Sequence, residues 1–218
     1  MKYKCVIFDC DGVLVDSVSI SNQVLIDMAK SVGLHMDMEL AMNMFSGASL
    51  MTAFEYIESK IETKLPDSFE KEFRTRTFEA FKKNIKPING VRNAIEQINV
   101  PYCVASSGPV NKIKLNLTVT NLIDKFDDEC IFSSYQINSW KPEPGIFLHA
   151  ANKMGFSPNE CVVVEDTVEG IKAAKAGGFN VFGYVDKSNK NLLKNEDVLV
   201  FNDMNNLNSL LTDTSDDN

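Results

Sequence analysis

Long apolar runs are absent from this chain of 218 residues. No segment approaches the roughly 20 apolar residues that cross a bilayer, so we expect no membrane span. The stretch before the first acidic residue is too short for a signal peptide. Basic residues are also scarce: 22 Lys and Arg face 30 Asp and Glu, which leaves a formal charge of −8. That charge disfavours nucleic acid and acidic membranes as partners, and nothing in the sequence indicates a protein partner.

Histidine and paired cysteine are scarce as well. His35 and His149 belong to no partner pattern, and we interpret both as structural. The five cysteines are an odd number without a CxxC pair, and the simplest interpretation is buried free thiols in a reducing compartment. We therefore expect a cytoplasmic protein. Its 44% hydrophobic residues suffice for one large domain, or for one domain with a smaller insertion.

Two carboxylates stand one residue apart after the first apolar run. Residues 5–8 are rich in β-branched and aromatic side chains, which predicts a buried strand that ends at Asp9 and Asp11. Like charges about 4 Å apart cost roughly 1 kcal/mol in water and about 4 kcal/mol at an effective dielectric of about 20. A shared proton, a nearby cation or a bound metal can offset that cost. The tripeptide by itself is equally consistent with a turn that carries two solvated acids.

Two different hydrophobic patterns divide the chain. Between residues 17 and 84, apolar residues recur every three or four positions in four stretches, which predicts four helices that bury their own faces. After residue 85, apolar runs alternate with helical stretches, which predicts right-handed strand–helix–strand units and a parallel sheet. We therefore predict an α/β, Rossmann-like core from residues 1–16 and 85–212, an inserted four-helix bundle from residues 17–84, and a disordered tail from residues 213–218.

Polar side chains end three of the predicted strands. The runs at residues 5–8, 102–105 and 161–164 are followed by Asp9 and Asp11, by Ser106 and Ser107, and by Glu165 and Asp166. Because ligands of parallel sheets bind at the carboxyl ends of the strands, these groups meet at one edge if the runs are parallel neighbours. Such a site gathers four carboxylates and needs cations. Lys141, in a loop braced by prolines, is one candidate, and a divalent metal is the other.

These residues, in this order, resemble the haloacid dehalogenase-like hydrolase superfamily, in particular its branch of β-phosphoglucomutase and sugar-phosphate phosphatases. The motifs that carry the likeness are residues 9–17, Ser106, residues 141–144 and residues 165–171. Four ordered motifs at predicted strand ends are far more specific than any one of them. The resemblance implies that the inserted helices, residues 17–84, form a cap domain over the site.

The resemblance implies a phosphatase that hydrolyses a small phosphorylated metabolite through an aspartyl-phosphate intermediate. Asp9 would be the nucleophile, and Asp11 would act first as acid and then as base. Ser106 and Lys141 would stabilise the phosphoryl group. Asp11 also favours phosphoryl transfer, because the resemblance implies that carbon–halogen hydrolases lack this second acid.

Magnesium is the cofactor that the resemblance implies. Its ligands would be Asp9, the backbone carbonyl of Asp11, and Asp166, with Glu165 as a direct or an indirect ligand. Taken singly, Glu165 and Asp166 are equally consistent with a pair of acids at the start of a helix.

Substrate choice is less strongly indicated. The candidate substrate-binding residues are Ser107, Gly108, Gly47, Ser49 and Lys112. Residues 106–112, together with residues 140–142, are most similar to bacterial 6-phosphogluconate phosphatases, although Ser107 stands where those proteins usually carry Asn. Lys112 would meet a substrate carboxylate, or else be a solvated helix residue.

Two alternative functions remain open. Proteins of the β-phosphoglucomutase type carry a Lys before the cap-loop glycine, an Arg three residues after it, and a His early in the first cap helix. The matching positions here hold Ser46, Leu50 and Ser21, so hydrolysis is favoured over a phosphomutase reaction. The alternative from another class is a non-catalytic protein that binds phosphorylated metabolites.

Overall fold

A six-stranded sheet organises the molecule, as the computed structural model shows for the residues that it describes, 2–45, 49–186, 189 and 193–212. Its order is β3-β2-β1-β4-β5-β6, and all neighbouring strands run parallel. The strands are β1 (Cys5–Phe8), β2 (Tyr102–Ser106), β3 (Ile131–Ser133), β4 (Cys161–Glu165), β5 (Asn180–Tyr184) and β6 (Leu199–Phe201). The predicted α/β class with a parallel sheet is confirmed.

β1 lies in the middle of the three strands that carry the polar ends. Phe8, its last residue, is in register with Val104 of β2 on one side and with Val164 of β4 on the other. The residues that follow these positions therefore emerge at the same edge of the sheet, as the sequence predicts.

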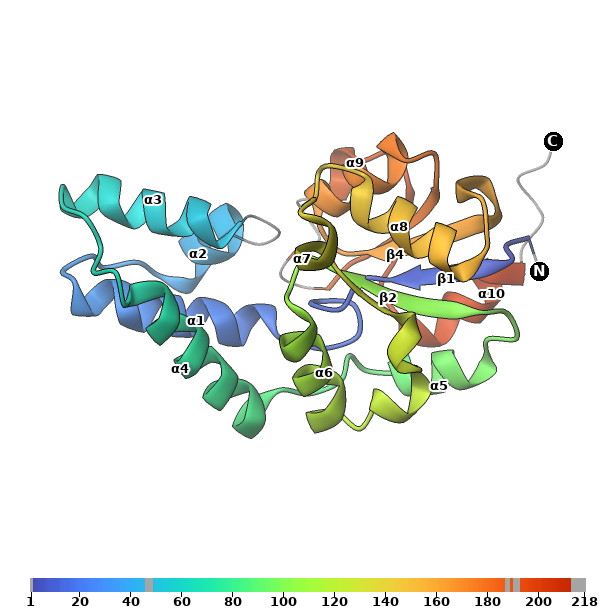
Figure 1. Ribbon diagram of the computed structural model, residues 1–218, viewed down its shortest axis with the longest axis horizontal. Coiled ribbons are helices and arrows are strands. Elements are labelled where there is room, and N and C mark those ends of the chain that lie inside the picture. Colours follow the sequence, from blue (N-terminus) through green and yellow to red (C-terminus); the bar gives the residue numbers. More distant parts are fainter. Residues whose placement is uncertain (1, 46–48, 187–188, 190–192, 213–218) are drawn as a thin grey trace.

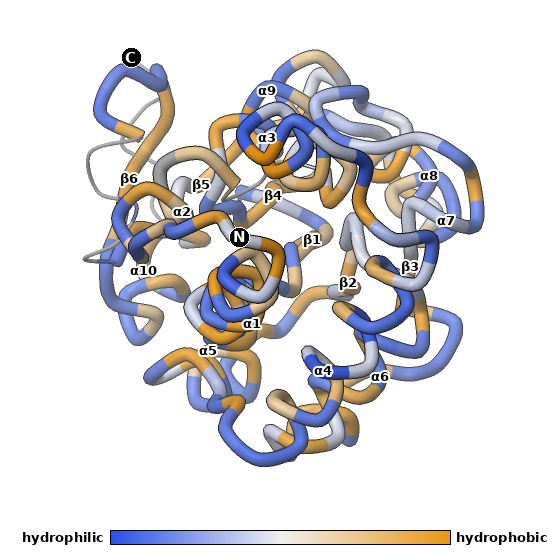
Figure 2. Tube along the Cα trace, turned by 90° about the vertical axis from the view of Figure 1, so that its left-hand side faces the viewer, coloured by the Kyte–Doolittle hydropathy of each residue, from blue (hydrophilic) through white to orange (hydrophobic). Residues whose placement is uncertain are grey.

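Helices cover both faces of the sheet (Figure 1). One face carries α5 (Val91–Gln97), α6 (Val110–Val119) and α10 (Leu207–Thr212), and the other carries α8 (Gly145–Met154) and α9 (Val168–Ala176). Side chains of β1 alternate between the two hydrophobic layers, because successive residues of a strand point to opposite faces. Since both faces are covered, the strands are mostly apolar, and β1 and β4 are so coloured in Figure 2.

Four helices between β1 and β2 lie beyond the carboxyl edge of the sheet (Figure 1). They are α1 (Val18–Ser31), α2 (Met38–Phe45), α3 (Leu50–Ile61) and α4 (Phe69–Asn84). They share a hydrophobic cluster of their own, which includes the buried side chains of Met28 and Ile57. This separate cluster agrees with the expected division of the chain into a core and an inserted domain at residues 17 and 84. The domain boundaries themselves stay a prediction. The expected tail, residues 213–218, lies outside the described residues.

Short elements and helix starts differ most from the sequence expectation. The structure adds a one-turn helix, α7 (Ser134–Ile137), directly after β3. α4 begins at Phe69, directly after a turn in which the Pro66 carbonyl oxygen accepts the Phe69 N–H. The 3₁₀ helices are η1 (Ile123–Lys125), η2 (Asp128–Cys130), η3 (Pro158–Glu160), η4 (Leu193–Asn195) and η5 (Met204–Asn206). Among the helices described, none combines the length and the apolar character needed to cross a bilayer.

The packing of α8 against the sheet can be tested with two neighbouring residues. Ile146 is fully buried, whereas Leu148 in the same helix is 39% exposed. We expect Ile146→Ala to lower the free energy of unfolding by about 2–5 kcal/mol, because it leaves a cavity. Leu148→Ala should change it by no more than about 0.5 kcal/mol. Urea denaturation measures both values, and equal losses would contradict the described orientation of the helix.

Candidate active site

The loop after β1 presents the two acids. The Asp9 N–H donates to the Val164 carbonyl oxygen at 3.0 Å, which continues the pairing of β1 with β4 into the loop. The loop then turns back on itself, since the N–H groups of Leu14 and Val15 both donate to the Cys10 carbonyl oxygen. Gly12 takes a φ of +85° in this turn, a conformation that suits glycine. The backbone thus holds the carboxylate of Asp9 at the end of the central strand, where it is only 5% exposed.

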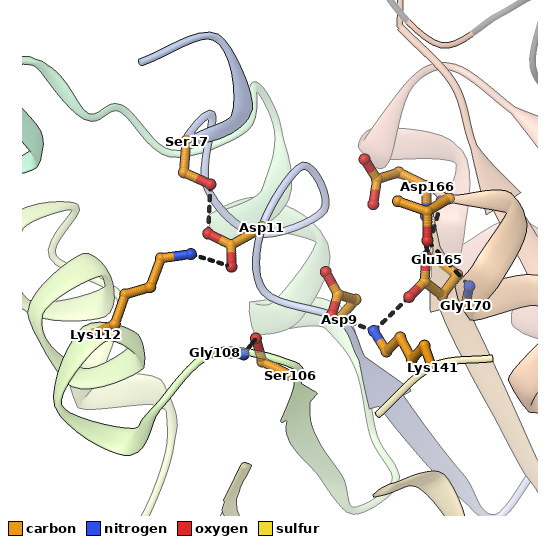
Figure 3. Close-up of polar contacts among 11 residues, drawn as sticks. Asp9, Asp11, Ser17, Ser106, Gly108, Lys112, Lys141, Glu165, Asp166 and Gly170 are labelled. Atoms are coloured by element: carbon orange, nitrogen blue, oxygen red, sulfur yellow. Dashed lines mark hydrogen bonds and ion pairs between the residues drawn. The ribbon is translucent and has the colours of Figure 1, made fainter. Parts of the chain in front are cut away.

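Lys141 forms a buried ion pair with two acids from different strand ends (Figure 3). Its Nζ lies 2.5 Å from Asp9 Oδ1 and 2.5 Å from Glu165 Oε1. The side chain is 5% exposed, and the ammonium also lies 4.9 Å from the centre of the Phe147 ring. Water therefore screens these charges little. Although burial alone would lower the pKa of Lys141, the charges of Asp9 and Glu165 raise it.

Glu165 is held by hydrogen bonds at both carboxylate oxygens. Oε1 accepts from Lys141, and Oε2 accepts from the backbone N–H groups of Asp166 and Thr167 and from Thr167 Oγ1. Thr167 also caps α9, because its Oγ1 accepts the Gly170 N–H at 3.1 Å. The first turn of α9 is thereby tied to Lys141 through a single carboxylate.

Asp166 is buried without a full set of hydrogen-bond partners. Its Oδ1 is buried and has no hydrogen-bond partner. Burial raises its pKa well above the usual value, and the neighbouring charges of Glu165 and Asp9 raise it further. The pKa of Asp9 is also raised by burial, although Lys141 opposes the shift. The described side chains include no group of three or more His, Cys, Asp or Glu already gathered to hold a metal ion.

Asp11 is turned toward a different set of partners (Figure 3). Ser17 Oγ donates to its Oδ1 at 2.5 Å, and Lys112 Nζ donates to its Oδ2 at 2.7 Å. Burial by itself would raise the pKa of Asp11, but the Lys112 charge and its hydrogen bond bring the pKa below the usual value. The two acids of the loop therefore have opposite environments: Asp9 shares a cation with Glu165, whereas Asp11 has Lys112 to itself among the described ion pairs.

The end of β2 adds a hydroxyl group and a tight turn. Ser106 is 1% exposed, and its Oγ accepts the Gly108 N–H at 3.1 Å, so the hydroxyl keeps its own hydrogen as a donor. The Gly108 carbonyl oxygen accepts from Ser133 Oγ at 2.6 Å, which links the turn to the end of β3. Ser107 lies in the same turn and faces the cavity described next.

A cavity of about 550 Å³ lies between the carboxyl edge of the sheet and helices α1–α4. Asp9, Asp11, Ser106 and Lys141 line its floor, together with Ser107, Gly108, Lys112 and Glu165. Its opposite side is largely apolar and is lined by Leu25, Phe45, Leu50, Phe54, Phe73 and Phe78. Ser49 also lines the cavity and caps α3, whereas Gly47 lies outside the described residues.

Three residues of the site were not singled out for it by the sequence. Ser17 ends the first motif, and its Oγ donates to Asp11. Thr167 follows Glu165 and Asp166, and its position before a helical run, typical of a helix cap, was the available signal. Arg74 lines the cavity from α4, and its Nη2 donates to the Tyr135 hydroxyl of α7 at 2.9 Å. No local pattern indicates this contact, because the two residues are 61 positions apart.

Comparison with known proteins gives consistent matches over most of the chain. The model of the haloacid dehalogenase-like hydrolase family matches residues 6–184. A 6-phosphogluconate phosphatase of Escherichia coli is 31% identical over 191 residues, which cover 87% of this chain and 86% of that protein. A phosphorylated carbohydrates phosphatase of Thermotoga maritima is 28% identical, with coverage of 85% and 87%. The crystal structure of a haloacid dehalogenase-like protein from Agrobacterium tumefaciens has a TM-score of 0.85 at 30% identity and covers 96% of this chain and 97% of its own.

Gly170 provides a test of how firmly Glu165 is held. A Cβ atom at this position would lie 1.9 Å from Glu165 Oε1 and 2.0 Å from its Cδ. Gly→Ala inside a helix normally stabilises by roughly 0.5–1 kcal/mol. We expect Gly170→Ala to destabilise instead, by about 2 kcal/mol or more, because Glu165 must move and lose charged hydrogen bonds. Chemical denaturation measures the change, and a gain in stability would show that Glu165 is free to move.

Proposed function

Because the chain belongs to the haloacid dehalogenase-like hydrolase family, we propose that it is a phosphatase, a phosphoric monoester hydrolase that acts on a small phosphorylated metabolite. The observation that carries the proposal is the juxtaposition of Asp9, Lys141 and Ser106 at one sheet edge, on the floor of a cavity. A nucleophile, a fixed cation and a hydroxyl donor are the groups that phosphoryl transfer requires.

The reaction proceeds in two displacements at phosphorus. A carboxylate oxygen of Asp9 attacks phosphorus, the ester P–O bond breaks, and the departing oxygen takes a proton from Asp11. Water then attacks the aspartyl-phosphate, Asp11 accepts the water proton, and the electron pair of the broken P–O bond returns to Asp9. Lys141 holds Asp9 and offsets negative charge, and Ser106 donates to a phosphoryl oxygen.

Mg²⁺ fits the charge distribution of the site. Asp166 Oδ1 is buried without a partner, and burial together with the neighbouring acids raises the pKa values of Asp9 and Asp166, so the acids of the site have fewer cationic partners than they need. We assign Asp9, Asp166 and the Asp11 carbonyl as the residues that hold the ion, which would neutralise charge between the carboxylates and the phosphate. Glu165 has both oxygens occupied by hydrogen bonds, so its role is to hold Lys141 and the start of α9.

Phosphorylated sugars and sugar acids are the proposed substrates. The relative from Escherichia coli supports 6-phosphogluconate, and the relative from Thermotoga maritima supports phosphorylated carbohydrates more generally. Arg74 lines the cavity, where its guanidinium pairs with Glu70, and it is the candidate to meet a second anionic group. Helices α1–α4 would serve as the cap that closes over the sugar, because they form the wall opposite Asp9. A screen of 6-phosphogluconate, glucose 6-phosphate and hexitol phosphates tests this order of preference.

Replacement of the nucleophile tests the reaction itself. We expect the wild-type protein to release phosphate from p-nitrophenyl phosphate and Asp9→Asn to be at least about 10³-fold slower, because the amide cannot attack phosphorus. Asp16→Asn is the matched control, since Asp16 lies in the same loop but is exposed. Equal activity of the wild type and Asp9→Asn would contradict the mechanism, and absence of phosphate release from every phosphate ester tried would favour a binding protein.

Magnesium binding can be followed without activity. We expect MgCl₂ to raise the unfolding temperature of the wild type, because a ligand that binds only the folded state stabilises it by about 2.7 kcal/mol at 100 times its Kd. Asp166→Asn should show no such rise, and without magnesium it should be at least as stable as the wild type, since it removes a buried acid that lacks a partner at Oδ1 and lies among other acids. Asp16→Asn should respond as the wild type does. An undiminished response of Asp166→Asn would exclude Asp166 as a ligand.

A further inference from the structure

Lys112 contacts a catalytic acid from a distant part of the chain. It belongs to the first turn of α6, and its Nζ lies 2.7 Å from Asp11 Oδ2, across 101 positions of sequence (Figure 3). Its side chain is 20% exposed, and that of Asp11 is 24% exposed. The pair therefore lies at the floor of the cavity rather than at the protein surface.

The lysine is directed at Asp11 by the groups that surround it. A Cβ atom at Gly108 would lie 3.2 Å from Lys112 Cδ, so the lysine stem runs along a residue that has no side chain. The ammonium lies 5.6 Å from the centre of the Phe81 ring, which is fully buried at the end of α4. Gly108 on one side and the Phe81 ring on another restrict the stem of Lys112. Its ammonium therefore pairs with Asp11.

Every described partner of the Asp11 carboxylate is placed to donate. Lys112 donates to Oδ2, and Ser17 Oγ donates to Oδ1. Asn116 Nδ2 adds a longer contact of 3.4 Å to Oδ1. An ammonium and an amide NH₂ group can only donate, and an ionised carboxylate can only accept. These three donors, two from α6 and one from Ser17, therefore fix the orientation of the Asp11 carboxylate.

We propose that Lys112 is a positioning residue for the second displacement, in which it fixes the orientation of the Asp11 carboxylate, the group that accepts the water proton. This inference rests on the proposed phosphatase function. In that step the water oxygen bonds to phosphorus, the water proton passes to Asp11, and the P–O bond to Asp9 breaks with its electron pair returned to Asp9. The ammonium takes no proton and forms no covalent bond. It fixes the direction in which the carboxylate accepts.

The test is Lys112→Met, assayed with p-nitrophenyl phosphate, whose leaving group departs without a proton. The first displacement should then be nearly unaffected and the second slowed. We expect kcat to fall at least about tenfold, KM to fall with it, and kcat/KM to stay within about threefold. A burst of p-nitrophenolate should precede steady turnover, and the intact mass of acid-quenched enzyme should show an added phosphoryl group.

Controls separate positioning from other roles. Lys114→Met, in the same helix, removes an exposed lysine whose Nζ lies 2.8 Å from Asp128, and it should behave as the wild type. Lys112→Arg retains the cation and should recover most of kcat. Lys112→Gln retains a donor without the charge and replaces Lys112→Met as the test variant if the latter does not fold, as judged by circular dichroism.

Other outcomes would overturn the proposal. A raised KM with unchanged kcat would show that Lys112 binds substrate directly. Equal falls in kcat and kcat/KM without phosphoenzyme would show a structural role. If the wild type releases no phosphate from any ester, the proposed function fails and this inference fails with it, whereas an active wild type with an unaltered Lys112→Met enzyme rejects the inference alone.

Discussion

Negative charge buried at one edge of a parallel sheet is the constraint on which the rest of this structure depends. Taking an ionised carboxylate out of water costs several kcal/mol unless a partner offsets it. Lys141 offsets two such charges at once, and it is itself 5% exposed between Asp9 and Glu165. The raised pKa of Asp166 indicates that its charge is not offset to the same degree. A stable fold favours buried acids that are fully paired. The proposed binding of a cation and a phosphate instead requires acids whose charge is not balanced before these ligands bind.

The sheet satisfies this constraint by its strand order. β2, β1 and β4 are adjacent, although the helices that connect them cover long stretches of sequence. Backbone pairing continues past β1 to Asp9, so the proposed nucleophile is set by the same hydrogen bonds that hold the sheet. Glu165 is the last residue of β4, and hydrogen bonds from Thr167 tie it to the start of α9 as well. The phosphate end of the proposed site is therefore built on the central strands of the sheet and on the start of a capped helix.

The opposite wall of the cavity has a different character. Helices α1–α4 supply mostly apolar side chains, and they bury a hydrophobic cluster that is separate from those of the sheet. Arg74 of α4 donates a hydrogen bond to the Tyr135 hydroxyl of α7. The Tyr135 ring packs edge to face against Trp140, the residue before Lys141. In the proposed function, the acids and Lys141 on the floor would perform the chemistry, and the separate wall would contact the rest of the substrate.

Local sequence determined the class of the fold and the location of the site. Apolar runs mark buried strands, and polar residues mark their ends, so the parallel sheet and the meeting of Asp9, Ser106 and Glu165 at one edge followed from residue order. Partner choice was decided only by the tertiary structure. Lys112, equally consistent with a solvated helix residue, contacts Asp11, and both oxygens of Glu165 are occupied. These contacts join residues far apart in the chain, and they depend on how α6 and α9 pack against the sheet, which no local pattern encodes.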